Sequence, residues 1–191
     1  MEIIGAIFII AFGTLGHFIF EWSGHRKCAG IFFAVNESTW EHIKLAIYPT
    51  LIWGIAEIVC KGWSSSIPVA TAAATISMMV LIPATFYGYT SIVGKNFLIA
   101  DITCFIASVV AGMFVFKALL GIQPGTALEI IAYIALAAII TAYFTLSYHP
   151  LHNFLFKDPI SGNYGPSGHD CNSDFHGVHR EHSHTHHNHS H

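Results

Sequence analysis

The stretch FLIADITCFIASVVAGMFVFKALL, residues 97–120, decides the fold because it is almost entirely apolar and long enough to cross a lipid bilayer. An α-helix rises about 1.5 Å per residue, so about 20 residues span a hydrocarbon core of about 30 Å. Four other stretches have the same character, at approximately 3–22, 43–60, 68–89 and 127–147. Isolated strands are unfavourable here, because an open sheet edge leaves backbone polar groups unsatisfied in lipid. We therefore predict an all-α integral membrane bundle of about five transmembrane helices.

The composition indicates that a bilayer is the solvent of this chain. Apolar residues make up 53% of the 191 residues and charged residues only 10%, against roughly 25% charged residues in soluble domains. The eight lysines and arginines are scattered, whereas nucleic-acid binding surfaces cluster their basic residues. The four cysteines stand singly and predict no disulfide framework. The predicted partner is the lipid bilayer, and nucleic acid is not expected.

The basic residues predict how the chain is oriented, because cytoplasmic loops of membrane proteins are enriched in lysine and arginine. If the N-terminus lies outside, the outer side holds only two basic residues, Lys61 and Lys117. The inner side then holds Arg26, Lys27, Lys44, Lys95, Lys157 and Arg180. We therefore predict a multi-pass protein of the cell (inner) membrane with a cytoplasmic C-terminus.

The composition changes near the C-terminus. Residues 1–164 hold the predicted transmembrane domain, whereas residues 165–191 contain too little apolar area to fold and are predicted to be a disordered, histidine-rich tail. Such a tail is typical of a segment that buffers or senses Zn, Ni, Co or Cu; an appendage without a task is the alternative. The predicted tail ligands are His182, His184, His186, His187, His189 and His191.

The predicted topology also brings polar residues of several helices to one depth, at the cytoplasmic end. Asn36-Glu37-Ser38-Thr39-Trp40-Glu41-His42-Ile43-Lys44 opens the second span, and Asp101 lies about one turn into the fourth. Ionisable groups at membrane depth are costly unless paired, so they commonly bind or move something. Candidate partners of Asp101 are Lys44, a histidine or a bound cation. The complete predicted site comprises His17, Glu21, Glu37, Glu41, His42, Asp101, His149 and His152.

These side chains suit metal binding, although each also has a structural explanation. Imidazole and carboxylate together are common ligands of Zn, Ni, Co, Fe or Mn, and the same groups can transfer protons. His17 and Glu21, four residues apart, can share one ion. Ser38 and Glu41 also fit a helix capping box, and Glu37 suits a helix N-terminus. If the site exists, the face of His17 and Glu21 contacts the face of Glu37 and Glu41.

The motif N-E-S-x-W-E-H-x-K at residues 36–44, after a span that ends in His17-x-x-x-Glu21, resembles an uncharacterised family of small multi-span prokaryotic membrane proteins. LFKDP at 155–159 and GNYG at 162–165 are similar to that family's C-terminal segment. The resemblance covers about residues 1–165 and implies an integral membrane protein without supplying an activity. A fainter similarity to membrane hydrolases of the ceramidase and adiponectin-receptor type does not extend to their zinc ligands, because the spans lack their H-x-x-x-H pair.

Three classes of function fit these residues. The first is binding or handling of a divalent transition metal, as a transporter or its accessory, for which five spans would require a homodimer. The second is an intramembrane hydrolase, metal-dependent or acid–base, that acts on lipid headgroups. The third is a non-catalytic membrane assembly subunit whose charged end docks a cytoplasmic partner.

Overall fold

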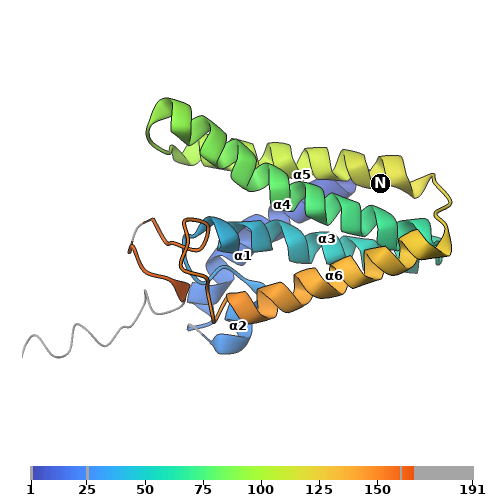
Figure 1. Ribbon diagram of the computed structural model, residues 1–191, viewed down its shortest axis with the longest axis horizontal. Helices are drawn as coiled ribbons and strands as arrows, with labels where there is room; N and C mark the ends of the chain where they lie inside the picture. Colours follow the sequence, from blue (N-terminus) through green and yellow to red (C-terminus); the bar gives the residue numbers. More distant parts are fainter. Residues whose placement is uncertain (1, 25, 160, 166–191) are drawn as a thin grey trace, which may run out of the picture.

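The predicted spans are helices in a computed structural model of the protein, which describes residues 2–24, 26–159 and 161–165 (Figure 1). Five helices are long and apolar enough to cross a membrane, which confirms the all-α class and the predicted number of spans. Within the described residues, the pairing outside helices is a single isolated bridge between Lys157 and Tyr164. The helices are α1 (Glu2–Trp22), α2 (Lys27–Phe32), α3 (Thr39–Lys61), α4 (Ser66–Val93), α5 (Leu98–Leu120) and α6 (Thr126–Leu146).

Helix α3 begins four residues before the predicted start of the second span, because Ser38 caps it. The Ser38 hydroxyl accepts a hydrogen bond from the Glu41 amide at 3.4 Å, which satisfies one of the unpaired donors of the first turn. The second hydrogen bond of the expected capping box, from the Ser38 amide to the Glu41 carboxylate, does not form. Asn36 Oδ1, rather than the Glu41 carboxylate, accepts the bond from the Ser38 amide at 3.0 Å. The Glu41 side chain is therefore available for other partners.

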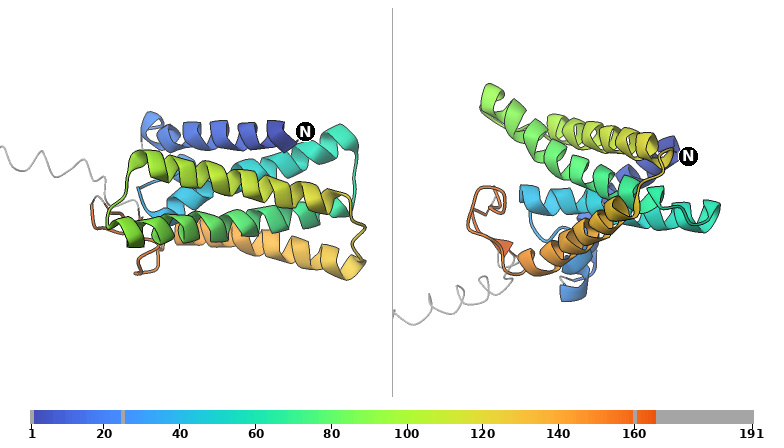
Figure 2. Two further views of the ribbon diagram at one scale, coloured as in Figure 1. Left: turned by 90° about the horizontal axis from the view of Figure 1, so that it is seen from above. Right: turned by 45° about the vertical axis from the view of Figure 1, so that its right-hand side comes forward.

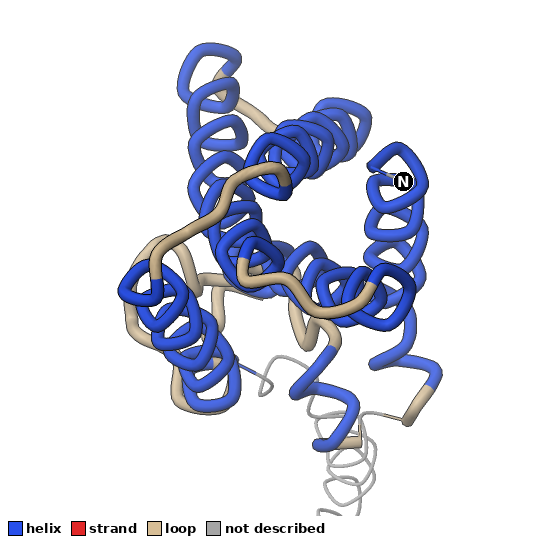
Figure 3. The backbone as a smooth tube through the Cα atoms, turned by 90° about the vertical axis from the view of Figure 1, so that its right-hand side faces the viewer, coloured by secondary structure: helices blue, strands red, loops and turns tan. Residues whose placement is uncertain are grey.

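Helix α4 is the centre of the packing. It contacts α3, α5 and α6, while α1 packs against α3 and α5. Figure 3 views the bundle end-on and shows α6 on the side of the bundle away from α1. Only 22% and 17% of the residues in the apolar windows of α5 and α6 are buried, although the mean hydropathy of these windows is 2.2 and 2.0. An apolar surface of this extent fits contact with a lipid bilayer.

The polar segments of the chain gather at one end of the bundle. Helices α1, α4 and α6 end there, and α3 and α5 begin there (Figures 1 and 2). The segment that follows α6 lies at the same end, and its Leu155 carbonyl accepts a hydrogen bond from the Trp40 amide in the first turn of α3. The segments that carry the predicted site residues therefore share one end, and helix rotation decides which side chains meet.

Helices α1 and α3 approach closely at Gly13. A Cβ atom at this position would lie 2.7 Å from the backbone carbonyl oxygen of Leu45 and 3.1 Å from Cζ of Phe105. A backbone oxygen inside a helix cannot move unless the helix shifts. The absence of a side chain at Gly13 therefore sets the position of the following turn of α1, which carries His17.

We predict that Gly13→Ala lowers the thermal stability of the protein in detergent micelles, by about 1–3 kcal/mol, because overpacking must displace α1 from α3. Gly88→Ala is the matched control, since a Cβ on Gly88 in α4 meets no atom within 4 Å. This second change should leave stability unaltered or raise it by up to about 1 kcal/mol. Equal melting temperatures for the two variants would contradict the close approach.

Candidate metal centre

Three of the predicted site residues meet at the shared end of the bundle. His17 Nε2 lies 3.4 Å from Glu37 Oε1, and His42 Nε2 lies 3.5 Å from Glu37 Oε2. One potential ligand atom from each of the three residues lies within 4.8 Å of the other two. We call these residues the His–Glu–His group. It joins the end of α1, the loop 33–38 and the first turn of α3.

Local structure fixes the tautomer of His42. The Nδ1 atom of this ring lies 3.0 Å from the carbonyl oxygen of Ser38, one turn earlier on α3. A carbonyl oxygen only accepts hydrogen bonds, so Nδ1 must carry the proton in this contact. In the neutral imidazole, Nε2 then bears the lone pair. Histidines that bind metals are commonly oriented in this way, with the second ring nitrogen donating to a backbone carbonyl.

The lone pair of neutral His42 Nε2 faces an oxygen of the Glu37 carboxylate. Two acceptors at 3.5 Å repel each other unless a proton or a metal cation lies between them. Donor atoms about 2.0–2.1 Å from a tetrahedral ion lie about 3.3–3.4 Å apart. The two contacts to Glu37 are close to this separation. The two contacts use different oxygens of Glu37, and one ligand atom from each residue lies within 4.8 Å of the other two, so the group has the donor atoms for a small divalent cation, which would draw them closer together.

The His–Glu–His group is open to solvent on one side. Its side chains retain 31% to 39% of their accessible surface. A cavity of about 60 Å³ lies beside the group and is lined by His17, Glu37, Asn36 and four apolar residues, Phe18, Phe20, Ala34 and Val35. An ion can reach the group from the aqueous side, and the cavity leaves room for a water or a small ligand next to it.

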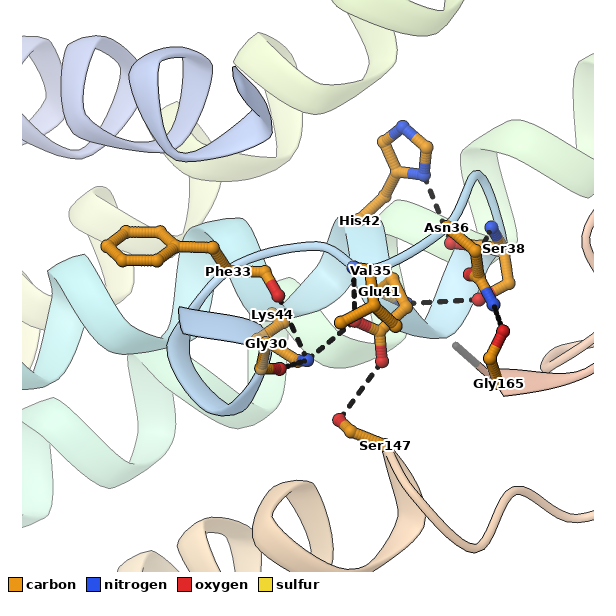
Figure 4. Close-up of polar contacts among 10 residues, drawn as sticks. All are labelled: Gly30, Phe33, Val35, Asn36, Ser38, Glu41, His42, Lys44, Ser147 and Gly165. Carbon is orange, nitrogen blue, oxygen red and sulfur yellow. Dashed lines mark hydrogen bonds and ion pairs between the residues drawn. The ribbon is translucent and has the colours of Figure 1, made fainter. Parts of the chain in front are cut away.

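Glu41 does not join this group, although it was predicted to. Its carboxylate is buried and accepts from Lys44 Nζ at 2.5 Å, from the Val35 amide at 3.1 Å and from Ser147 Oγ at 3.0 Å. Figure 4 shows these partners arranged around Glu41, with His42 on the other side of α3. The carboxylate is thus committed to a structural network that ties α3 to the loop 33–38 and to the end of α6.

Lys44 completes the same network. Its ammonium group is fully buried and also donates to the carbonyl oxygens of Gly30 at 2.9 Å and Phe33 at 3.3 Å. Three acceptors satisfy the three protons of an ammonium group. Because Gly30 and Phe33 belong to α2 and its C-terminal end, this ion pair holds α2 and the loop against α3. The loop in turn presents Glu37 to the two histidines.

A C-terminal segment, residues 151–159 and 161–165, lies against the start of α3, and we call it the strap. The ring of Trp40 stacks on Tyr143 of α6 and on Phe156 of the strap, with centroids 4.2 and 4.6 Å apart. The side-chain amide nitrogen of Asn36 (Nδ2) donates to the Gly165 carbonyl oxygen at 3.1 Å. The strap is therefore fixed at both the stacked tryptophan and the residue that precedes Glu37.

The remaining predicted site residues lie outside the His–Glu–His group. Asp101 accepts hydrogen bonds from the Tyr89 hydroxyl and, at 3.4 Å, from the Asn96 side chain. The expectation that Lys44 or a histidine partners Asp101 is therefore wrong, because residues of its own helical hairpin do so. His149 and His152 are exposed, and the His152 ring packs on Tyr164. The side chain of Glu21 and the tail histidines 182–191 lie outside the described part of the structure.

Sequence reasoning missed the roles of two residues at this end of the bundle. Ser147 donates to Glu41 from 106 positions along the chain, and no spacing rule connects residues that far apart. The motif at residues 36–44 predicts no role for Asn36, yet its side chain accepts a hydrogen bond from the Ser38 amide and donates one to the Gly165 carbonyl of the strap. An asparagine two residues before a helix cap is a signal for the first of these contacts.

We predict that Lys44→Met destabilises the protein by about 3–5 kcal/mol, because it leaves the Glu41 carboxylate buried without its cation. The double variant Glu41→Gln/Lys44→Met should recover much of this loss, since no unpaired charge remains. Lys95→Met, at an exposed lysine, is the control and should change stability by less than about 0.5 kcal/mol. Thermal unfolding in micelles measures all three. A Lys44 variant as stable as the Lys95 variant would contradict the network's role.

The model of one protein family, described as a family of unknown function (DUF6512), matches residues 1–166. This match agrees with the expected resemblance to an uncharacterised family over about residues 1–165. No curated protein and no solved structure matches the chain.

Proposed function

We propose that this chain, which belongs to the family of unknown function DUF6512, is a membrane protein that binds a divalent transition metal at His17, Glu37 and His42. The observation that carries the proposal is the orientation of His42. Its Nδ1 donates to the Ser38 carbonyl, and its Nε2, which points at the Glu37 carboxylate, carries a lone pair for a metal ion when the ring is neutral. A cation between these two acceptors resolves their repulsion, and His17 supplies a third ligand.

The ligand set favours a metal ion that keeps one coordination position free of protein ligands. Two imidazoles and one carboxylate suit Zn, Co, Ni, Fe or Mn. Three protein ligands leave one tetrahedral position vacant, as in catalytic zinc sites, whereas structural zinc sites use four protein ligands. The partial exposure of the group supports this, because an open position needs access. We propose that the ion exchanges with the aqueous phase rather than holding the fold together.

The distribution of basic residues supports a cytoplasmic location for the group. Arg26 and Lys27 lie at the start of α2, four and five residues after the end of α1, and Lys95 lies in the turn between α4 and α5 at the same end of the bundle. Lys61 lies at the end of α3, on the opposite end. By the positive-inside rule, we propose that the His–Glu–His group faces the cytoplasm of the cell membrane.

Metal binding at the His–Glu–His group must be measured without the tail histidines, because imidazoles in the tail would bind the same ions. We therefore expect the full-length chain with its nine tail histidines changed to glutamine to bind one equivalent of Co²⁺ or Zn²⁺ by titration calorimetry. In that background His17→Ala, Glu37→Gln and His42→Ala should each weaken binding by at least about tenfold, because each removes one of three ligands.

Matched controls distinguish this site from the wider predicted cluster. Asp101→Asn and His149→Gln, in the same background, remove polar groups at the same end of the bundle and should leave the affinity within about twofold. No binding in the parent background would refute the metal site. Equal losses for Asp101→Asn and Glu37→Gln would refute the assignment of ligands.

A lipid-headgroup hydrolase is the second candidate, favoured by an apolar groove next to the group. The groove has a volume of about 260 Å³ and is lined by residues of α1, the end of α2 and α3. Gly16, which lines it, directly precedes His17, and Leu45 lies one turn after His42. A groove in this position would hold an acyl chain while an attached headgroup met the ion, which could activate a water molecule.

We expect, on this second hypothesis, that Zn²⁺-loaded protein in phosphatidylglycerol vesicles releases a water-soluble headgroup or a fatty acid that mass spectrometry detects. Glu37→Gln should lower the rate by at least about a hundredfold, because the metal-activated water is lost. No product from the loaded protein would leave metal binding as the function without hydrolysis. Product formation at the same rate with the Glu37 variant would refute hydrolysis at this site.

A further inference from the structure

The line of contact between α1 and α3, which we call the α1–α3 seam, carries the His–Glu–His group at one end and the apolar groove along the rest. On α3, the helix face of His42 continues at spacings of three or four residues through three residues that line the groove, Leu45, Pro49 and Ile52. On α1, Gly16 lines the groove and His17 follows it directly. Between the two helices, Phe33 lines the groove and the next residue, Ala34, lines the cavity beside the group. The groove and the group are therefore neighbours on all three segments.

The groove opens on the apolar outer surface of the bundle and has the depth of one leaflet of a bilayer. Three of its lining residues, Phe32, Ile52 and Ile55, keep 45%, 42% and 62% of their surface exposed. From Leu45 to Ile55, α3 advances by ten residues, or about 15 Å at 1.5 Å per residue. This length is half of a hydrocarbon core of about 30 Å. The groove therefore matches a single acyl chain that lies along the seam.

The lining of the groove selects an apolar occupant. Of its eleven residues only Tyr48 has a polar side chain, and the hydroxyl of Tyr48 is buried. Water is disfavoured in such a space because it finds too few hydrogen-bonding partners. An unfilled groove is also disfavoured, because its lining atoms lose their dispersion contacts. The bilayer around five apolar helices supplies acyl chains that satisfy both conditions.

The chemistry of the group selects the head of that chain. A divalent ion held by the Glu37 carboxylate and two neutral imidazoles keeps one positive charge and one vacant position, and a carboxylate oxygen is an ordinary zinc ligand. A single carboxylate would fill the position and neutralise the charge. The groove begins at Leu45, three residues after His42, or about 4.5 Å along the helix. A fatty acid carries its carboxylate directly on the chain, whereas ester and glycerol groups separate the phosphate of a phospholipid from its acyl carbons. The short separation therefore fits a fatty acid.

We propose that the α1–α3 seam binds a long-chain fatty acid, with its chain in the groove and its carboxylate on the metal ion at the His–Glu–His group. This inference rests on the proposed metal site and adds the ligand of its vacant position. On binding, a carboxylate oxygen replaces a water molecule on the ion. Unlike the hydrolase hypothesis, this binding requires no bond of the lipid to break.

The test titrates palmitate, acetate and phosphatidylglycerol into Co²⁺-loaded protein in uncharged maltoside micelles. The protein is the full-length chain with its nine tail histidines changed to glutamine. The visible absorption of Co²⁺ changes when a carboxylate replaces water, so it reports the head of the ligand directly. Ile52→Trp fills the groove. Ile76→Trp is the matched control, because Ile76 on α4 lies outside the groove and is 44% exposed, against 42% for Ile52.

We expect palmitate to change the Co²⁺ absorption at a half-saturating concentration at least about tenfold below that of acetate, because a chain held in the groove gives its carboxylate a high effective concentration at the ion. Ile52→Trp should raise the value for palmitate at least about tenfold and leave the value for acetate within about twofold, because a chain enters a filled groove only by overpacking it. The unchanged acetate response shows that this variant keeps its metal site. Ile76→Trp should change neither value.

Three results would overturn the fatty-acid ligand while the metal site stands. The first is Co²⁺ binding with no change in absorption on adding palmitate. The second is an equal palmitate response in the two tryptophan variants, which would exclude the groove as the place of the chain. The third is a phosphatidylglycerol response as strong as that of palmitate, which would assign the seam to a phospholipid. Failure to bind Co²⁺ before any ligand is added would instead refute the metal site itself.

Discussion

The buried ion pair between Glu41 and Lys44 is the interaction on which the polar end of the molecule depends. Two opposite charges in a membrane helix can be buried only if they pair with each other and if their remaining donors and acceptors also form hydrogen bonds. Here the Lys44 ammonium also donates hydrogen bonds to two backbone carbonyls. The Glu41 carboxylate accepts hydrogen bonds from a backbone amide and from a serine hydroxyl. The pair thus works as a junction between α2, the loop 33–38, α3 and the end of α6.

The two acidic residues of one short motif have separate tasks. Glu41, on the buried face of α3, organises the backbone, whereas Glu37, four residues earlier and still in the loop, stays partly exposed beside His17 and His42. The division follows from the point at which the helix begins. Ser38 is the N-cap of α3, so Glu41 lies within the helix and its direction is set by the helix, whereas Glu37 lies in the loop before it. Helix capping therefore determines which carboxylate is available to an ion.

The shared end of the bundle also receives the C-terminal part of the chain. Trp40 stacks between α6 and the strap, and Asn36 fastens the last described residue beside the cavity. Aromatic stacking and one buried hydrogen bond therefore hold the strap, as far as Gly165, against the start of α3.

The sequence by itself determined the five helices, because length and apolar composition permit little else in a bilayer. It also determined the cap at Ser38 and the candidate set that contains His17, Glu37 and His42. Spacing along the chain fixes the depth of a residue in the bundle but not the rotation of its helix. Only the tertiary structure turned His17 towards Glu37, through the close contact at Gly13 and the Glu41–Lys44 junction. Separately, the pairing of α4 with α5 placed Asp101 beside the Tyr89 hydroxyl. Contacts such as Ser147 with Glu41 were beyond sequence reasoning, because they depend on how distant helices pack and not on any local pattern.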